Sequence, residues 1–133
     1  MAIKIVECVP NFSEARRPEV MEEILKEIRC VQGVTLLDQH SDLDHNRTVV
    51  TFLGQPEAVE EAAFRGIARA SQLIDLNVHT GEHPRIGATD VVPFIPISDV
   101  TMQECVEMAR RLGKRVAEEL NIPVFMYEEA AIR

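Results

Sequence analysis

The sequence has no long apolar run. Its longest apolar stretches, such as VVPFIPI at 91–97, fall far short of the ~20 residues that a membrane-spanning helix requires. The first ten residues also lack the basic start and the extended apolar segment of a secretory signal peptide. We therefore expect a cytoplasmic protein without membrane contact.

Cysteine and positive charge are scarce. The three cysteines, Cys8, Cys30 and Cys105, lie in apolar contexts without CxxC spacing, which predicts reduced, buried thiols rather than a disulfide framework or a zinc site. The formal net charge is −8, and no run of Lys or Arg exceeds two residues. Such a chain repels phosphate backbones, so the charge argues against a nucleic-acid partner. A chain with this net charge can bind an anionic small molecule only where a local cluster of hydrogen-bond donors outweighs the overall negative charge.

Motifs of several enzyme classes are also missing. The chain has no GxGxxG or Walker sequence, no GxSxG nucleophile and no cysteine in a nucleophile context. Nucleotide chemistry and covalent acyl transfer therefore lack support. Imidazole is the reactive side chain that remains.

What is present is the composition of one folded domain. The 133 residues are 46% hydrophobic and 27% charged, close to the averages of globular proteins. No internal repeat, low-complexity segment or linker divides the chain. We expect a single domain with one core.

The apolar pattern alternates between strands and helices. Branched apolar runs predict strands at 3–9, 34–40, 47–53, 89–97 and 123–127. Apolar residues that recur at three and four positions predict helices at 18–31, 56–74 and 101–121. Pro18 suits a first helical turn, and Thr101 with Glu104 forms a capping box.

The order of these elements predicts an α+β fold. The first six read β-α-β-β-α-β, as in the ferredoxin-like sandwich, and one helix and one strand are appended. Pro93 and Pro96 cannot donate to a ladder, which predicts that the strand at 89–97 lies at an edge or contains a bulge. Gly66 inside a helix indicates a close packing contact.

The segment from 75 to 88 is longer than ordinary connections and carries His79 and His83. The apolar residues within this segment argue that it is ordered, which favours a functional segment over a disordered one. HTGEH matches H-x-x-E-H, a zinc protease pattern that needs both histidines on one helical face. Gly81 disfavours a helix and Pro84 moves His83 away from the α region, so we expect no metal site.

The polar stretch at 41–46 imitates the start of an EF-hand loop. Arg47 occupies the position that requires Gly, and Leu53 occupies the position that requires Glu. This reading is rejected. We expect a hairpin turn whose Asp and Asn side chains bond their own backbone.

A histidine in a Gly and Pro segment beside Glu82 and Arg85 suits general acid and base catalysis. Its ordinary pKa of ~6.5 lets an imidazole both accept and return a proton near neutral pH. The competing interpretation is a surface or structural histidine with no chemical role.

Six stretches resemble the amino-terminal half of glutamate formimidoyltransferases. They are ECVPNFSE, DHNRTVVTF, AAFRGIARASQLIDL, GEHPRIGATDVVPFIP, CVEMARRLGKRVAEEL and IPVFMYEEAA, which together cover essentially all of 1–133. GEHPRxGAxDVxPFxP is long and chemically unusual, so the likeness is specific.

The resemblance implies transfer of the formimidoyl group of N-formimidoyl-L-glutamate to tetrahydrofolate, in histidine degradation and one-carbon metabolism. It implies two ferredoxin-like halves that face each other across the active site, with tetrahydrofolate as co-substrate and no metal. The His of GEHPR, here His83, is then the catalytic acid and base.

Substrate contacts follow from the same resemblance. The donor's carboxylates need hydrogen-bond donors, for which the candidates are Arg47, Arg85 and amides near Gly81 and Gly87, with Glu82 beside them and with Asn11 and Asn46 as neutral groups. Alternatively, both asparagines cap turns, and Arg47 pairs with Asp42 or Asp44 on the surface.

The sequence departs from the family pattern in two places. Ala15 stands where the family commonly has Gly after NFSE, and the relatives continue beyond EEAAIR into a second half that supplies much of the folate site. We therefore expect association with a carboxy-terminal half or with another copy of the chain, through an exposed sheet face. The alternative function is a non-catalytic binding or assembly module that kept the fold.

Overall fold

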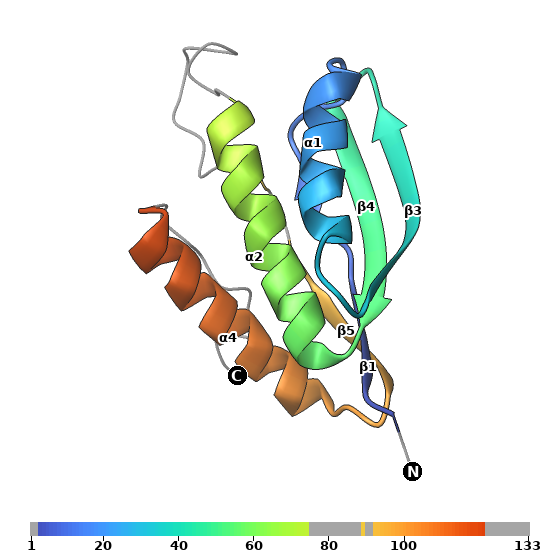
Figure 1. Ribbon diagram of the computed structural model, residues 1–133, viewed down its shortest axis with the longest axis vertical. Coiled ribbons are helices and arrows are strands. Elements are labelled where there is room, and N and C mark those ends of the chain that lie inside the picture. The colour runs from blue at the N-terminus through green and yellow to red at the C-terminus, as the bar shows by residue number, and fades with distance from the viewer. Residues whose placement is uncertain (1–2, 75–88, 90–91, 122–133) are drawn as a thin grey trace.

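The computed structural model describes residues 3–74, 89 and 92–121. Within them the elements are β1 (Ile5–Cys8), β2 (Asn11–Phe12), α1 (Pro18–Arg29), β3 (Val34–Asp42), β4 (Arg47–Gly54), α2 (Pro56–Leu73), β5 (Phe94–Ser98) and α4 (Met102–Glu119) (Figure 1). The strand expected at 123–127 lies outside the described residues. No described helix is both long enough and apolar enough to cross a membrane.

Strand β4 lies inside an antiparallel sheet. It pairs with β3 on one side and with β1 and β2 on the other, and β5 pairs with β1. If β1 and β2 are counted as one interrupted strand, the order across the sheet is β5, β1/β2, β4, β3. With helices α1 and α2 as crossovers, this is the predicted β-α-β-β-α-β arrangement, so the α+β ferredoxin-like prediction is confirmed.

One strand boundary was predicted wrongly, beside a proline. The strand expected at 3–9 is found as β1, to within two residues at either end, and Pro10, which has no N–H for the ladder, follows it; the Pro10 carbonyl accepts from the Val50 amide at 3.0 Å. The strand expected at 89–97 begins only at Phe94, directly after Pro93. Thr89 makes only an isolated bridge with Phe12.

The remaining boundaries agree with the sequence to within a few residues. Helix α4 begins with the predicted capping box, in which Thr101 Oγ1 accepts from the Glu104 amide at 3.0 Å and Glu104 Oε1 accepts from the Thr101 amide at 2.8 Å. Strand β5 is an edge among the described strands, and its register with β1 shifts beside Pro96. The predicted edge position is therefore confirmed.

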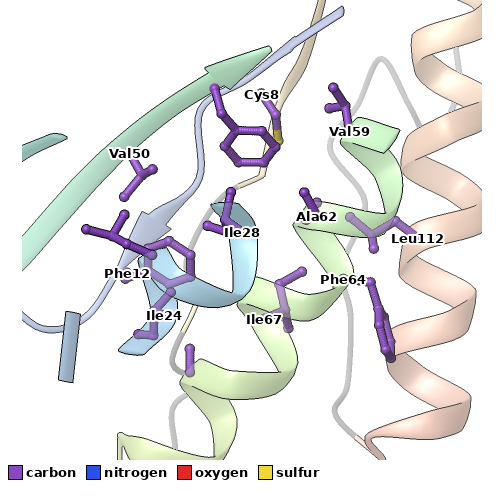
Figure 2. Close-up of a cluster of buried hydrophobic side chains, with 14 of the residues drawn as sticks. Cys8, Phe12, Ile24, Ile28, Val50, Val59, Ala62, Phe64, Ile67 and Leu112 are labelled. Carbon is purple, nitrogen blue, oxygen red and sulfur yellow. The ribbon is translucent and has the colours of Figure 1, made fainter. Parts of the chain in front are cut away.

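The three described helices lie over one face of the sheet (Figure 1). Thr48, Val50 and Phe52 of β4 alternate toward them and are fully buried. Figure 2 shows Phe12 of β2 lying between Val50 and Ile24 of α1. Among the described residues, twenty-two apolar ones form this core, so burial against the helices fixes which side of β4 faces inward.

Helix α4 is attached to the outer side of α2. Phe64 of α2 points toward α4 (Figure 2), and the Arg115 guanidinium lies 3.6 Å from the centroid of its ring. Arg115 also donates to Glu61 at 2.8 Å, and Arg111 donates to Glu60 at 2.9 Å. The hydrogen bond from Arg115 is the largest effect that lowers the pKa of Glu61, so this attachment weakens as pH falls through that pKa.

The cysteine prediction is correct for two residues and wrong for one. All three thiols are free, and Cys8 and Cys105 are buried, but Cys30 follows the end of α1 and is exposed. Burial raises the pKa of Cys8 well above its ordinary value and also raises that of Cys105. The thiolate is the reactive form, so the three cysteines differ in reactivity.

A thiol reagent at neutral pH therefore labels Cys30 first. Cys8 and Cys105 react only as fast as the fold opens, which peptide mass spectrometry after timed labelling measures. Labelling of Cys8 at the rate of Cys30 in the folded protein would contradict the described core.

Two glycines make close contacts that differ in kind. A Cβ on Gly54 would lie 2.2 Å from the Gly33 carbonyl oxygen, whereas a Cβ on Gly66 would meet the end of the Ile28 side chain at 3.1 Å. The second contact confirms the prediction made for Gly66. A backbone carbonyl cannot move as readily as the tip of a side chain.

Gly54→Ala is therefore expected to lower the free energy of unfolding by about 2 kcal/mol, as overpacking does. Gly66→Ala is expected to change it by less than about 1 kcal/mol, because the gain in helix propensity offsets the contact. Urea denaturation of both variants measures the difference, and equal destabilisation would show that the two contacts are equally rigid.

Candidate functional site

The face of the sheet opposite the helices, called the open face below, is not covered by any described helix. On β4 this face carries the half-buried Val49, Thr51 and Leu53, which alternate with the buried residues. Asn11 of β2 is directly opposite Val49, and Arg47 is opposite Asp42 of β3. Two of the predicted substrate residues, Asn11 and Arg47, therefore belong to one face.

Asn46 precedes Arg47 in the tight turn between β3 and β4 and has a left-handed φ of 53°. Its Oδ1 accepts from the amides of Ala15 at 2.8 Å and Arg16 at 3.1 Å. In return, Arg16 donates through Nε to the Leu43 carbonyl at 2.9 Å and through Nη2 to the Asp44 carbonyl at 3.1 Å. These bonds join the β2–α1 loop to the β3–β4 turn, and we call the set, Ala15, Arg16, Leu43, Asp44 and Asn46, the clasp.

A series of hydrogen bonds between buried polar groups lies next to the clasp and connects it to β4. Thr48 donates to the Glu14 carbonyl at 2.6 Å, so Ser41 is the donor in its 2.9 Å contact with the Thr48 hydroxyl. The Glu14 side chain is only 2% exposed and accepts from Nη2 of Arg17 at 2.7 Å and from the Arg17 amide at 3.0 Å. The β2–α1 loop, which contains Ala15, is thus hydrogen-bonded both to the β3–β4 turn and to Thr48 of β4.

The β3–β4 turn fulfils the predicted turn chemistry at Asp42. Asp42 Oδ1 accepts from the amides of Asp44 and His45, and His45 Nδ1 lies 2.8 Å from Asp42 Oδ2. The hydrogen bond with the His45 side chain is the main cause that lowers the pKa of Asp42. At Asn46 the expectation was wrong in detail, because its oxygen bonds the neighbouring loop rather than its own turn.

His83, Gly81, Glu82, Arg85 and Gly87 lie outside the described residues. The described chain resumes at Thr89, which bridges to Phe12 and so lies beside the strand that carries Asn11. Its hydroxyl is buried and has no hydrogen-bond partner in the described part of the chain. Phe12 is buried toward the helices, so its bridge partner Thr89 faces the core rather than the open face.

No group of three or more metal-ligating side chains occurs among the described residues. The polar groups on the open face and in the turn beside it include amides, hydroxyls, carboxylates, imidazoles and the guanidinium of Arg47. Such groups bind and orient a small polar ligand by hydrogen bonds and ion pairs.

Comparison with known proteins assigns this arrangement to a family. The sequence profile of the formiminotransferase domain, N-terminal subdomain, matches residues 5–133. The chain belongs to the formiminotransferase family. The glutamate formimidoyltransferase of Streptococcus pyogenes is 50% identical over 130 residues, which are 98% of this chain and 44% of that protein. The formimidoyltransferase-cyclodeaminase of Mus musculus is 54% identical over 128 residues, which are 96% of this chain and 24% of that protein.

A third relative has the same relation to this formiminotransferase subdomain. The glutamate formimidoyltransferase of Thermoplasma acidophilum is 50% identical over 131 residues, which are 98% of this chain and 43% of that protein. The chain thus spans less than half the length of the relatives it matches.

The clasp of the formiminotransferase subdomain predicts a graded response at Asn46. Asn46→Ala leaves two amides without their acceptor and places a Cβ residue at left-handed φ, so the free energy of unfolding is expected to fall by about 2 kcal/mol. Asn46→Asp keeps the Oδ1 acceptor and is expected to stay within about 0.5 kcal/mol.

Asn46→Gly keeps the backbone conformation and removes only the acceptor, so its loss should be intermediate. Thermal or urea unfolding measures all three variants. Equal stability of Asn46→Ala and the unsubstituted chain would show that the clasp does not stabilise the turn.

Proposed function

We propose that this chain is the amino-terminal part of a glutamate formimidoyltransferase. The reaction transfers the formimidoyl group of N-formimidoyl-L-glutamate to tetrahydrofolate, which is a co-substrate. The observation that carries the proposal is the match of nearly the whole chain, at about half identity, to proteins named for that transfer. The open face, which carries Asn11 and Arg47, supports a ligand site on that side of the sheet.

In the proposed mechanism, His83 moves the protons. N5 of the folate attacks the amidine carbon and forms a C–N bond, which gives a tetrahedral intermediate. His83 accepts the proton that the attacking amine loses and returns it to the nitrogen of glutamate. The C–N bond to glutamate then breaks, and the products are 5-formimidoyl-tetrahydrofolate and glutamate.

The remaining predicted residues bind and orient the substrates. Arg47 and Arg85 pair with the donor's carboxylates, while Asn11, Glu82 and the backbone near Gly81 and Gly87 supply further hydrogen bonds. Asn46 belongs to this set as proposed from the sequence, although its side-chain oxygen already accepts two backbone amides. Fixing two reactants in this way contributes at least as much to the rate as the proton transfers.

A second half of the enzyme is proposed to cover the open face. Ile95 and Ile97 of β5 are 37% and 52% exposed on an edge strand, and Leu53 of β4 lies on the same side of the sheet. The relatives are more than twice as long as this chain. A carboxy-terminal half that packs on this surface would bury these apolar groups.

The test is formimidoyl transfer by the chain alone and by the chain mixed with a carboxy-terminal half taken from a close relative. Turnover is expected in the mixture. His83→Ala is expected to lower kcat by about 10²- to 10⁴-fold, which is the usual contribution of positioned proton transfer.

His79→Ala is the matched control, because it removes an imidazole from the same segment. It is expected to leave kcat within about threefold, since general acid and base catalysis needs one histidine. An equal fall in kcat in both variants would indicate that the two histidines are a pair of metal ligands instead. If His83→Ala left kcat unchanged, a non-catalytic binding or assembly module would be favoured. Formation of a stable homodimer instead of a complex with the carboxy-terminal half would contradict the proposed partner.

A further inference from the structure

His40 lies on the open face, in the same row of side chains as Asn11. Register places Val49 of β4 opposite Asn11 of β2 on one side and opposite His40 of β3 on the other. Directly opposed residues point to the same face of a sheet. Because Val49 faces away from the helices, Asn11 and His40 do so too, about 10 Å apart across the small apolar side chain of Val49.

Polar groups also occupy the two neighbouring rows. Arg47 is opposite Asp42 in one of them, and Thr51 is opposite Asp38 in the other. The rows are spaced about 7 Å apart along the strand. His40 therefore stands between two rows. One holds the Arg47 guanidinium and the Asp42 carboxylate, which is already hydrogen-bonded within the turn, and the other holds the Asp38 carboxylate.

The other half of the same face has a different character. Leu53 is opposite Glu7 of β1, and Glu7 is opposite Ile95 of β5. Ile5 and Ile97 lie near this row on β1 and β5, and Ile97 is an exposed apolar side chain. This half of the face carries more exposed apolar side chains than the rows of Asn11, His40 and Arg47, although Glu7 lies among them, and this difference distinguishes a ligand surface from the proposed packing surface.

N-Formimidoyl-L-glutamate matches the order of the polar rows. Its amidine, which is a cation near neutral pH, is on the α-nitrogen beside the α-carboxylate, and its γ-carboxylate lies at the other end of the molecule. Arg47 suits the γ-carboxylate, Asp38 suits the amidine, and an imidazole between them donates or accepts one hydrogen bond. His40 is exposed, and no described side chain bonds it.

We propose that His40 is a substrate-binding residue that hydrogen-bonds N-formimidoyl-L-glutamate on the open face, between Arg47 and Asp38. This inference rests on the proposed function and adds a residue to its donor site. It assigns His40 to the donor and not to the folate.

The test measures KM for each substrate separately in the mixture of the chain and the carboxy-terminal half. His40→Ala is expected to raise KM for N-formimidoyl-L-glutamate about tenfold, as the loss of one hydrogen bond to a charged group does, and to leave KM for tetrahydrofolate unchanged. His40→Gln keeps a donor and an acceptor and should recover most of that loss. Gln39→Ala is the matched control, because Gln39 is the exposed neighbour that points to the other face of the strand.

A binding measurement separates this inference from the proposed function. The His40 ring signals in the NMR spectrum of the chain, assigned by their absence in His40→Gln, are expected to shift when N-formimidoyl-L-glutamate is added. Normal turnover with unchanged KM in His40→Ala, or a rise in KM for tetrahydrofolate instead, would overturn the inference and leave the proposed function intact. Absence of turnover in the unsubstituted mixture would contradict the proposed function, and unshifted ring signals would then overturn the role of His40 as well.

Discussion

The alternation of buried and half-buried residues along β4 is the constraint on which the rest of this structure depends. Thr48, Val50 and Phe52 are fully buried beneath the helices, so a shift of one residue would expose all of them. Because β4 pairs with β1, β2 and β3, its register determines on which face of the sheet most other strand residues lie. The apolar core therefore decides which polar side chains reach the open face.

The periodic parts of the fold were predictable from the sequence. Helices α1, α2 and α4 follow from apolar spacing, and the capping box of Thr101 and Glu104 marks the start of α4 correctly. The error occurs where proline removes an amide, since the apolar run predicted as a strand at 89–97 continues through Pro93 although β5 begins only after it. Composition alone does not reveal where a ladder stops.

The candidate site was predictable only in part, for a physical reason. The signal for His83 is a local motif, which a sequence displays directly. The clasp joins Arg16 to residues of the β3–β4 turn almost thirty positions away, and the row of Asn11 and His40 exists only once the register of three strands is known. Relations of this kind depend on tertiary pairing, so Arg16 and His40 carried no sequence signal of their own.

Gly33 and Gly54 meet where β3 begins and β4 ends, with the Gly33 carbonyl occupying the space that a side chain at position 54 needs. Gly33 also has a φ of 95°, which few other residues adopt. A side chain at either position would require the backbone at the other to move, so the two glycines can be substituted only together, in evolution or in design. Libraries that aim to change ligand preference are better confined to the opposite end of the hairpin, since diversity at this corner would mostly yield chains that fail to fold.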